Sequence, residues 1–170
     1  MRVAAFGDIP RLVEMLGEAQ AASIHSGLTF DAQEARRLVF NAIQRHGRRT
    51  EGASFVAVVD GAERIEAFVI GVLQRVYLIQ TELEATDLFL IATEAAPREA
   101  ASALLGGMKA WAWASPAVVQ VVCAATGVLG RPIRGGRETA SARNWKITGR
   151  WLRASGMTPC GEIYREGKPL

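Results

Sequence analysis

Arginines are interspersed with glycines in one stretch of the chain, which makes it a candidate for binding an anion. This arginine segment, Gly127 to Arg143, shows no helical or strand period and contains Arg131, Arg134, Arg137 and Arg143. Guanidinium groups bind phosphate and carboxylate groups in pairs of hydrogen bonds, so the segment could hold a nucleic acid or an acidic partner protein. No aromatic residue stands among the arginines to stack on bases, which disfavours nucleic acid. A solvated loop is the alternative.

Three carboxylates precede an apolar run and could accept a proton from a substrate. Glu82, Glu84 and Asp87 come just before Leu88–Ala92. A carboxylate that is buried there could have a raised pKa, which would suit a general base. A solvated acidic turn is the alternative, and the charge pattern favours it.

Composition and length exclude several classes of protein. A chain of 170 residues suits a single domain, and we expect one over residues 1–170. The 49% of hydrophobic and 22% of charged residues exclude wholesale disorder. No apolar run reaches about 18 residues, the length needed to span a membrane, and no signal peptide is evident. Cys123 and Cys160 form neither a metal motif nor a disulfide framework, so we expect a reducing, cytosolic environment and no metal.

The elements that must position these groups follow from caps, periodicity and turn residues. Val3 and Ala5 suggest a short first strand, Asp8 and Asp31 are expected to cap two helices, and Asp60-Gly61 predicts a hairpin. The other expected strands are Phe55–Val59, Ile65–Val76, Leu88–Ala92, Ala117–Ala124 and Cys160–Arg165, and the later helices are Pro97–Ala114 and Asn144–Ala154, which Gly156 ends. The resulting order, β-α-α-β-β-β-α-β-α-β, predicts an α/β (α+β) fold in which helices cover a mixed sheet.

This order and several local segments resemble the GNAT superfamily of N-acetyltransferases. The matching segments are Arg2–Val13, Val56–Gly61, Ile65–Gly71, Leu88–Ala114 and Trp151–Met157. Within the superfamily the chain looks most like the acetyltransferase-like proteins of tailed bacteriophages and prophages, on Lys109–Ala112 and Thr126-Gly127. The resemblance implies a GNAT-like mixed, mostly antiparallel sheet flanked by helices.

The resemblance also implies a binding site for acetyl-CoA where a strand leads into a helix. The family motif there is Arg or Gln, two residues, Gly, one residue, then Gly or Ala, and it holds a pyrophosphate on backbone N–H groups. Arg98, Ala101, Ser102 and Ala103 occupy this motif, with Ala101 in place of the glycine. Glu99 adds a negative charge beside the expected pyrophosphate. The arginine segment could instead grip the 3′-phosphate of the coenzyme.

The catalytic residues that the resemblance implies are a base and an acid. The family often uses a carboxylate on or near the fourth strand to take the proton of the amine, and Glu82 or Glu84 has that position. A tyrosine near the start of the last helix often protonates the leaving thiolate. Residues Arg150–Arg153 stand there without a tyrosine, and Tyr164 lies outside the motif.

Two functions from different classes remain open at this point. The first is an acetyl-CoA-dependent N-acetyltransferase acting on the amine of a small molecule or a protein. The second is a non-catalytic GNAT-fold component of a tailed-phage or prophage-derived particle, which binds other protein subunits through the arginine segment. No membrane partner is expected for either function.

Overall fold

The computed structural model describes residues 1–23, 25–77, 79, 81–124 and 149–160. The chain divides into two compact units, residues 1–17 with 31–124 and residues 18–30 with 125–170. The expectation of one domain stays a prediction. The arginine segment and residues 161–165 of the expected last strand lie outside the described residues. Within the described ranges, no helix has the length and apolarity that a membrane crossing requires.

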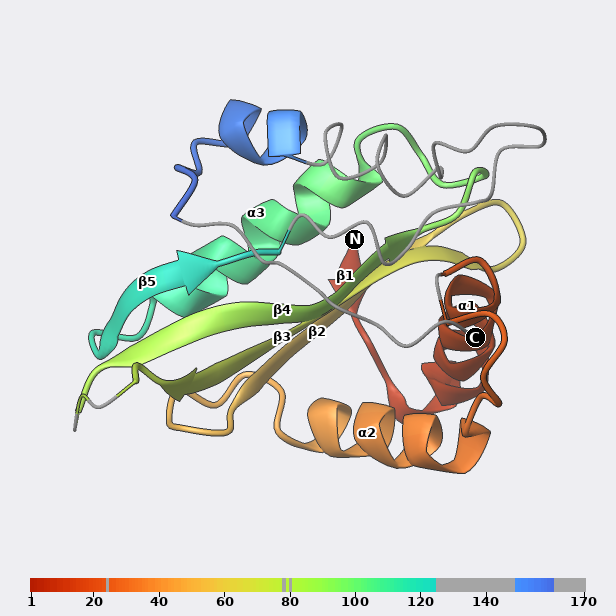
Figure 1. Ribbon diagram of the computed structural model, residues 1–170, viewed down its shortest axis with the longest axis horizontal. Helices are drawn as coiled ribbons and strands as arrows, with labels where there is room; N and C mark the ends of the chain where they lie inside the picture. Colours follow the sequence, from red (N-terminus) through yellow and green to blue (C-terminus); the bar gives the residue numbers. More distant parts are fainter. Residues whose placement is uncertain (24, 78, 80, 125–148, 161–170) are drawn as a thin grey trace. The chain divides into compact units, whose positions relative to one another are not determined.

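The first unit is built on a five-stranded sheet whose strands follow one another in chain order (Figure 1). The strands are β1 Arg2–Val3, β2 Ser54–Asp60, β3 Ile65–Arg75, β4 Leu83–Ala92 and β5 Val118–Val122. Neighbours from β1 to β4 are antiparallel, whereas β4 and β5 are parallel. The parallel pair is joined by helix α3, Ala100–Trp113. The prediction of a mixed, mostly antiparallel sheet flanked by helices is confirmed.

The β2–β3 hairpin forms at the Asp60-Gly61 signal, as predicted. Its turn is closed by the N–H of Gly61, which donates to the carbonyl oxygen of Arg64 at 2.7 Å. A Cβ atom added to Gly61 would lie 2.6 Å from Cγ of Glu66, so the close approach of that side chain requires glycine. The hairpin therefore fixes both the register of β2 on β3 and the place of Glu66.

Helices α1 and α2 precede the hairpin, and one of the two expected caps is correct. Helix α2, Ala32–Gln44, is capped by Asp31, whose carboxylate accepts from the N–H of Glu34 at 2.9 Å. Asp8 is not the cap of α1, Ile9–Ala21, because a 3-10 turn over Phe6–Asp8 already begins the helical conformation. The Asp8 carboxylate instead accepts from the N–H of Ala5 and pairs with Arg2, each at 2.7 Å.

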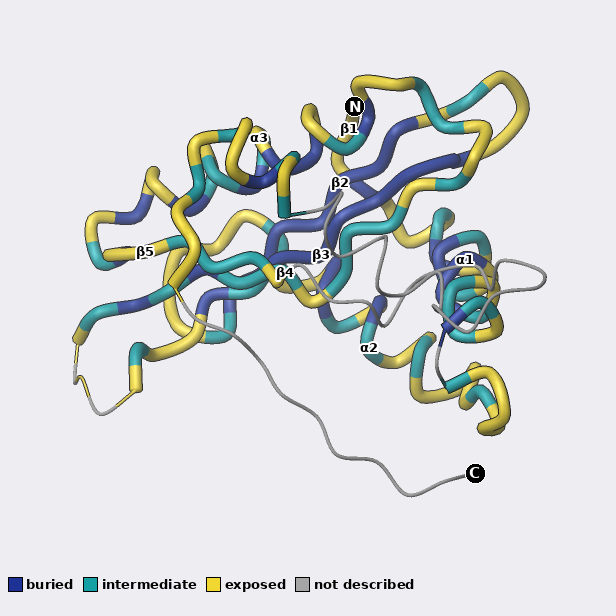
Figure 2. Tube along the Cα trace, turned by 45° about the horizontal axis from the view of Figure 1, so that its top comes forward, coloured by how far each residue is buried: buried dark blue, intermediate teal, exposed yellow. Residues whose placement is uncertain are grey.

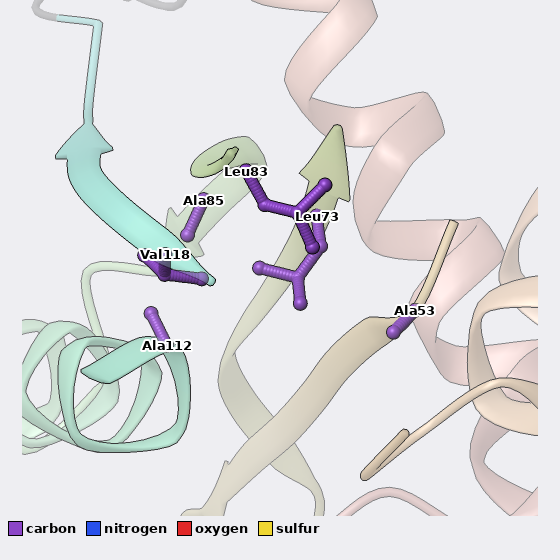
Figure 3. Packing of buried hydrophobic residues seen from close by; sticks show 6 residues of the cluster. All are labelled: Ala53, Leu73, Leu83, Ala85, Ala112 and Val118. Atoms are coloured by element: carbon purple, nitrogen blue, oxygen red, sulfur yellow. The ribbon is translucent and has the colours of Figure 1, made fainter. Parts of the chain in front are cut away.

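The core of the first unit lies on both faces of the central strands. β2 and β3 are buried along almost their whole length, because α3 covers one face of the sheet and α2 packs on the other (Figures 1 and 2). Figure 3 shows the cluster between the sheet and α3, formed by Ala53, Leu73, Leu83, Ala85, Ala112 and Val118. Gly71 lets the two layers meet closely, since a Cβ there would lie 2.6 Å from Sδ of Met108.

The second unit contains a short described helix over residues 149–154. Gly156 has a φ of 80°, a left-handed conformation that favours glycine, and the N–H of Met157 donates to Leu152 at 3.0 Å. Both features are typical of a helix C-terminus. The prediction that Gly156 ends the last helix is confirmed, whereas the expected start at Asn144 lies outside the described residues.

Candidate coenzyme and proton-transfer site

Strand β4 carries two of the three predicted carboxylates, Glu84 and Asp87, because it begins earlier than the sequence suggested. Residues 83–87 form the first half of the strand rather than an acidic turn before it. The pairing with β3 then shifts at Leu88, since Gly71 pairs with Asp87 and Ile70 pairs with Phe89. This bulge inserts one residue and changes which face the later side chains occupy. Asp87 lies before the bulge, and regular alternation along the strand puts it on the face of Leu83 and Ala85, which pack toward α3.

The pairing of β4 with β5 ends next to Asp87, and we call the place where the two strands part the fork. The two strands pair only as far as Thr86, opposite Val122. Among the described residues no strand pairs with the outer edge of 88–92. The N–H of Thr93 donates to Glu66 on β3 at 2.8 Å. Because N–H groups alternate along a strand, those of Leu90 and Ala92 point to the open edge.

Asp87 lies at the base of the fork and has the surroundings of a proton acceptor. Burial raises the pKa of Asp87, and hydrogen bonds from Ala124 and Cys123 act in the opposite direction. The N–H of Ala124 lies 3.2 Å from Oδ1 of Asp87. Burial and the neighbouring carboxylate raise the pKa of Cys123 to about 12, so its thiol is protonated at neutral pH, and the nearby charge of Lys109 only partly offsets this.

The two carboxylates that the sequence favoured as bases occupy different surroundings. Glu84 lies between Gln74 on β3 and Gln120 on β5, and both amides donate to its carboxylate, at 2.7 and 2.6 Å. Glu82 precedes the strand, and the hydroxyl of Thr81 donates to it at 2.8 Å. That hydrogen bond lowers the pKa of Glu82. A base role for Glu82 or Glu84 stays a prediction, and neither lies where the pairing of β4 with β5 ends.

The predicted coenzyme residues meet at the first turn of α3, directly after the loop 93–99 that follows β4. Ala101 is half-buried, and Ser102, Ala103 and Arg98 are exposed. Glu99 holds the capping position, but its side chain makes no capping hydrogen bond. The N–H of Ala101 makes no hydrogen bond to another described residue, and Arg98 makes no ion pair within the described ranges. Small side chains and an uncapped turn fit an anion.

Sequence reasoning gave Asp87 no special weight and missed the fork. The alternation of Leu83, Glu84, Ala85 and Thr86 was a strand signal that could have extended β4 and placed Asp87 on its inner face. The bulge at Leu88 has no comparable local signal. Among the described residues no group of three potential metal ligands comes together.

Comparisons with known proteins identify the architecture. No profile of a known family matches the chain, and no curated protein matches it. Several solved structures match over nearly all of both chains. A possible acetyltransferase from Clostridium difficile 630 is 12% identical, with 99% of this chain and 96% of that chain covered and a TM-score of 0.63.

Two other solved structures give the same result. Glucosamine-6-phosphate N-acetyltransferase from Arabidopsis thaliana is 10% identical, with 98% and 95% covered and a TM-score of 0.62. A transcriptional regulator from Bacillus halodurans C-125 is 14% identical, with 98% and 97% covered and a TM-score of 0.63. At such identities the likeness establishes the fold rather than an activity. The fork, the uncapped helix turn and these likenesses together show that the chain has the fold of the GNAT acetyltransferases.

Proposed function

We propose that the chain is an acetyl-CoA-dependent N-acetyltransferase acting on an amine. The observation that carries this proposal is the fork between β4 and β5, with the half-buried carboxylate of Asp87 at its base and the first turn of α3 beyond the end of β4. An extended thioester requires a free strand edge, an anion site at one end and a proton acceptor at the other. Asp87 supplies the proton acceptor, residues 88–92 supply the free strand edge, and the turn at Ala101 supplies the anion site.

The residues of the chain divide the chemistry among them. Asp87 accepts the proton of the amine, whose nitrogen forms a bond to the carbonyl carbon of the thioester while the carbon–sulfur bond breaks. The outward N–H of Leu90 donates to the carbonyl oxygen as negative charge develops there. When it is bound, acetyl-CoA would supply the acetyl group, and coenzyme A would leave as the thiolate, which takes up a proton from solvent. Arg98 and the N–H of Ala101 hold its pyrophosphate.

The first turn of α3 has room for the pyrophosphate of the coenzyme, but the negative charge beside it is unfavourable. Ala101, Ser102 and Ala103 leave room for a phosphate near the backbone. Glu99 stands at the capping position of the same turn and is exposed, and its charge opposes that of a pyrophosphate. We therefore infer a low affinity that substitution can improve.

Thermal unfolding with acetyl-CoA tests this proposal, using the wild type and the variant Glu99→Gly/Ala101→Gly. A ligand present at about 100 times its dissociation constant stabilises the folded state by about 2.7 kcal/mol, which corresponds to about 5–10 °C in this size class. We expect a shift in the wild type and a shift at lower coenzyme concentration in the variant. Ala110→Gly is the matched control, because it places a glycine on the exposed side of the same helix away from the turn.

The contrary result also has a clear meaning. No shift at about 1 mM acetyl-CoA in either protein would exclude binding at this turn, because even a dissociation constant of about 0.1 mM would then stabilise measurably. The alternative function, a non-catalytic component of a phage or prophage-derived particle, would be favoured instead. The exposed carboxylate of Glu99 at the capping position of the turn is the specific observation that favours this alternative. If it is correct, Glu99→Gly/Ala101→Gly should leave coenzyme binding and assembly unchanged.

A further inference from the structure

Glu66 is an acidic side chain in an unusual place for a charge. It lies on β3 with 7% of its surface exposed, and within the described ranges it is the only buried carboxylate. Buried charges are costly unless they are paired and hydrogen-bonded. Arg64 donates to one carboxylate oxygen at 3.1 Å, and Arg11 lies 3.8 Å from the other. The pKa of Glu66 is lowered, first by a hydrogen bond from Thr93 and then by Arg64.

Thr93 ties the end of β4 to this carboxylate by two separate bonds. Its hydroxyl donates to Oε2 of Glu66. Its backbone N–H donates to the carbonyl oxygen of the same residue at 2.8 Å. Thr93 is also the first residue of the loop 93–99, and it turns that loop. Its hydroxyl accepts from the N–H of Ala95 at 3.3 Å, and its carbonyl oxygen accepts from Ala96 at 3.2 Å.

Most residues of the loop 93–99 are exposed. Glu94, Ala95, Arg98 and Glu99 are exposed, so they bury little apolar surface that could fix the backbone. The carboxylate of Glu66, by contrast, is fixed from several sides. Arg11 donates to the carbonyl oxygen of Ile65 at 3.1 Å, and Gly61 leaves room for the Glu66 side chain. We call the hydrogen bonds between Glu66 and Thr93 the tether. Its rigid end is Glu66 on the sheet, and its other end restrains the loop 93–99.

We propose that Glu66 and Thr93 are positioning residues, which hold the loop 93–99 so that the first turn of α3 faces the open edge of β4. This inference rests on the proposed function, because the restrained turn is the one assigned to the pyrophosphate. Neither residue touches the coenzyme. The tether sets the distance between the N–H groups of β4 and the anion site, and both must contact one extended molecule.

The test compares acetyl-CoA affinity in Thr93→Val, Thr93→Ser and a matched control. Thr93→Val keeps the side-chain shape and removes the hydroxyl, whereas Thr93→Ser keeps the hydroxyl. Thr50→Val makes the same chemical change at an exposed loop residue away from the fork. We expect coenzyme binding to weaken by about 5- to 30-fold in Thr93→Val, because a hydrogen bond to a charged group is lost. Thr93→Ser and Thr50→Val should bind within about twofold of the wild type.

Amide hydrogen exchange without coenzyme gives a second readout. Backbone amides of residues 94–99 should exchange about tenfold faster in Thr93→Val, while those of β2 and β3 keep their rates. If Thr93→Val does not fold, Glu66→Gln replaces it as the variant. Its amide can still accept from Thr93 but lacks the charge, so binding should weaken by about 3- to 10-fold.

The outcomes separate this inference from the function on which it rests. Coenzyme binding in the wild type with no loss in Thr93→Val or Glu66→Gln would overturn the positioning role alone. A loss that Thr93→Ser does not restore would also overturn it, because the effect would not depend on the hydroxyl. Absence of binding in the wild type would overturn the proposed function and the inference together.

Discussion

Replacing Gly71 by alanine should destabilise the protein, and the structure indicates which residue resists the change. The added Cβ would lie 2.6 Å from Sδ and 2.8 Å from Cγ of Met108 on α3. Met108 is 0% exposed, so its side chain has no route into solvent. Overpacking of this kind typically costs about 1–3 kcal/mol. We expect Gly71→Ala to lower the free energy of unfolding by that amount.

A double variant isolates the proposed cause. Met108→Ala alone removes a fully buried side chain and should cost about 2–5 kcal/mol, including the cavity left behind. In Gly71→Ala/Met108→Ala the new methyl group enters space that Met108 vacated, so the overpacking disappears. The double variant should therefore be at least about 1 kcal/mol more stable than the sum of the two single losses predicts.

Urea unfolding followed by circular dichroism measures all four proteins, with linear extrapolation to water. Equal slopes against urea would show that the variants unfold between comparable states. The reasoning is refuted if the single losses add within about 0.5 kcal/mol, or if Gly71→Ala is as stable as the wild type. Because Gly71 pairs with Asp87 across the strands, a loss of acetyl transfer in Gly71→Ala that Met108→Ala restores would link this packing to the site.

Two further predictions concern the titrating carboxylates. The pKa of Asp87 lies above its ordinary 3.8 in the folded protein, so the folded state holds that proton more tightly than the unfolded chain, and this contribution to stability is lost as pH rises above about 3.8. Asp87→Asn should therefore melt higher than the wild type at pH 7 and transfer acetyl groups about 10²- to 10⁴-fold more slowly; unchanged turnover would reject Asp87 as the base. The pKa of Glu66 lies below its ordinary 4.5, so its stabilisation is present above about pH 4.5 and is lost as pH falls toward the folded value. Glu66→Gln should flatten the fall in the urea midpoint below pH 5, and a midpoint that falls as steeply as in the wild type would contradict the assignment.

The parts of the fold that the sequence predicted correctly have strong local causes. Asp31 caps α2 because its side chain reaches an N–H only three residues away. Asp60-Gly61 turns the chain between two strands rich in β-branched residues, and Gly156 accepts a left-handed conformation. The start of α3 was also placed within a few residues, with Arg98, Ala101, Ser102 and Ala103 together at its first turn. Each of these outcomes depends on neighbours along the chain.

The parts that the sequence did not predict depend on contacts between distant segments. Asp8 has a good capping side chain, but Arg2 and the N–H of Ala5 engage it, so the helical turns begin before it. The bulge at Leu88 depends on how β4 meets β3, and the early start of β4 at Leu83 puts Asp87 rather than Glu84 on the inner face. Glu82 and Glu84 therefore looked equivalent to Asp87 in sequence, although only Asp87 lies at the base of the fork.

The agreement between strand order and chain order has a consequence for how the molecule assembles. β2, β3 and β4 are joined by short connections, so bringing them together requires the closure of small loops and little loss of chain entropy. β5 can pair only after the longer excursion through α3 has closed, and its pairing with β4 ends at Thr86. We expect this last contact to form late and to open first. The hydrogen bonds between β4 and β5 would then be able to break and re-form while β2, β3 and β4 stay folded.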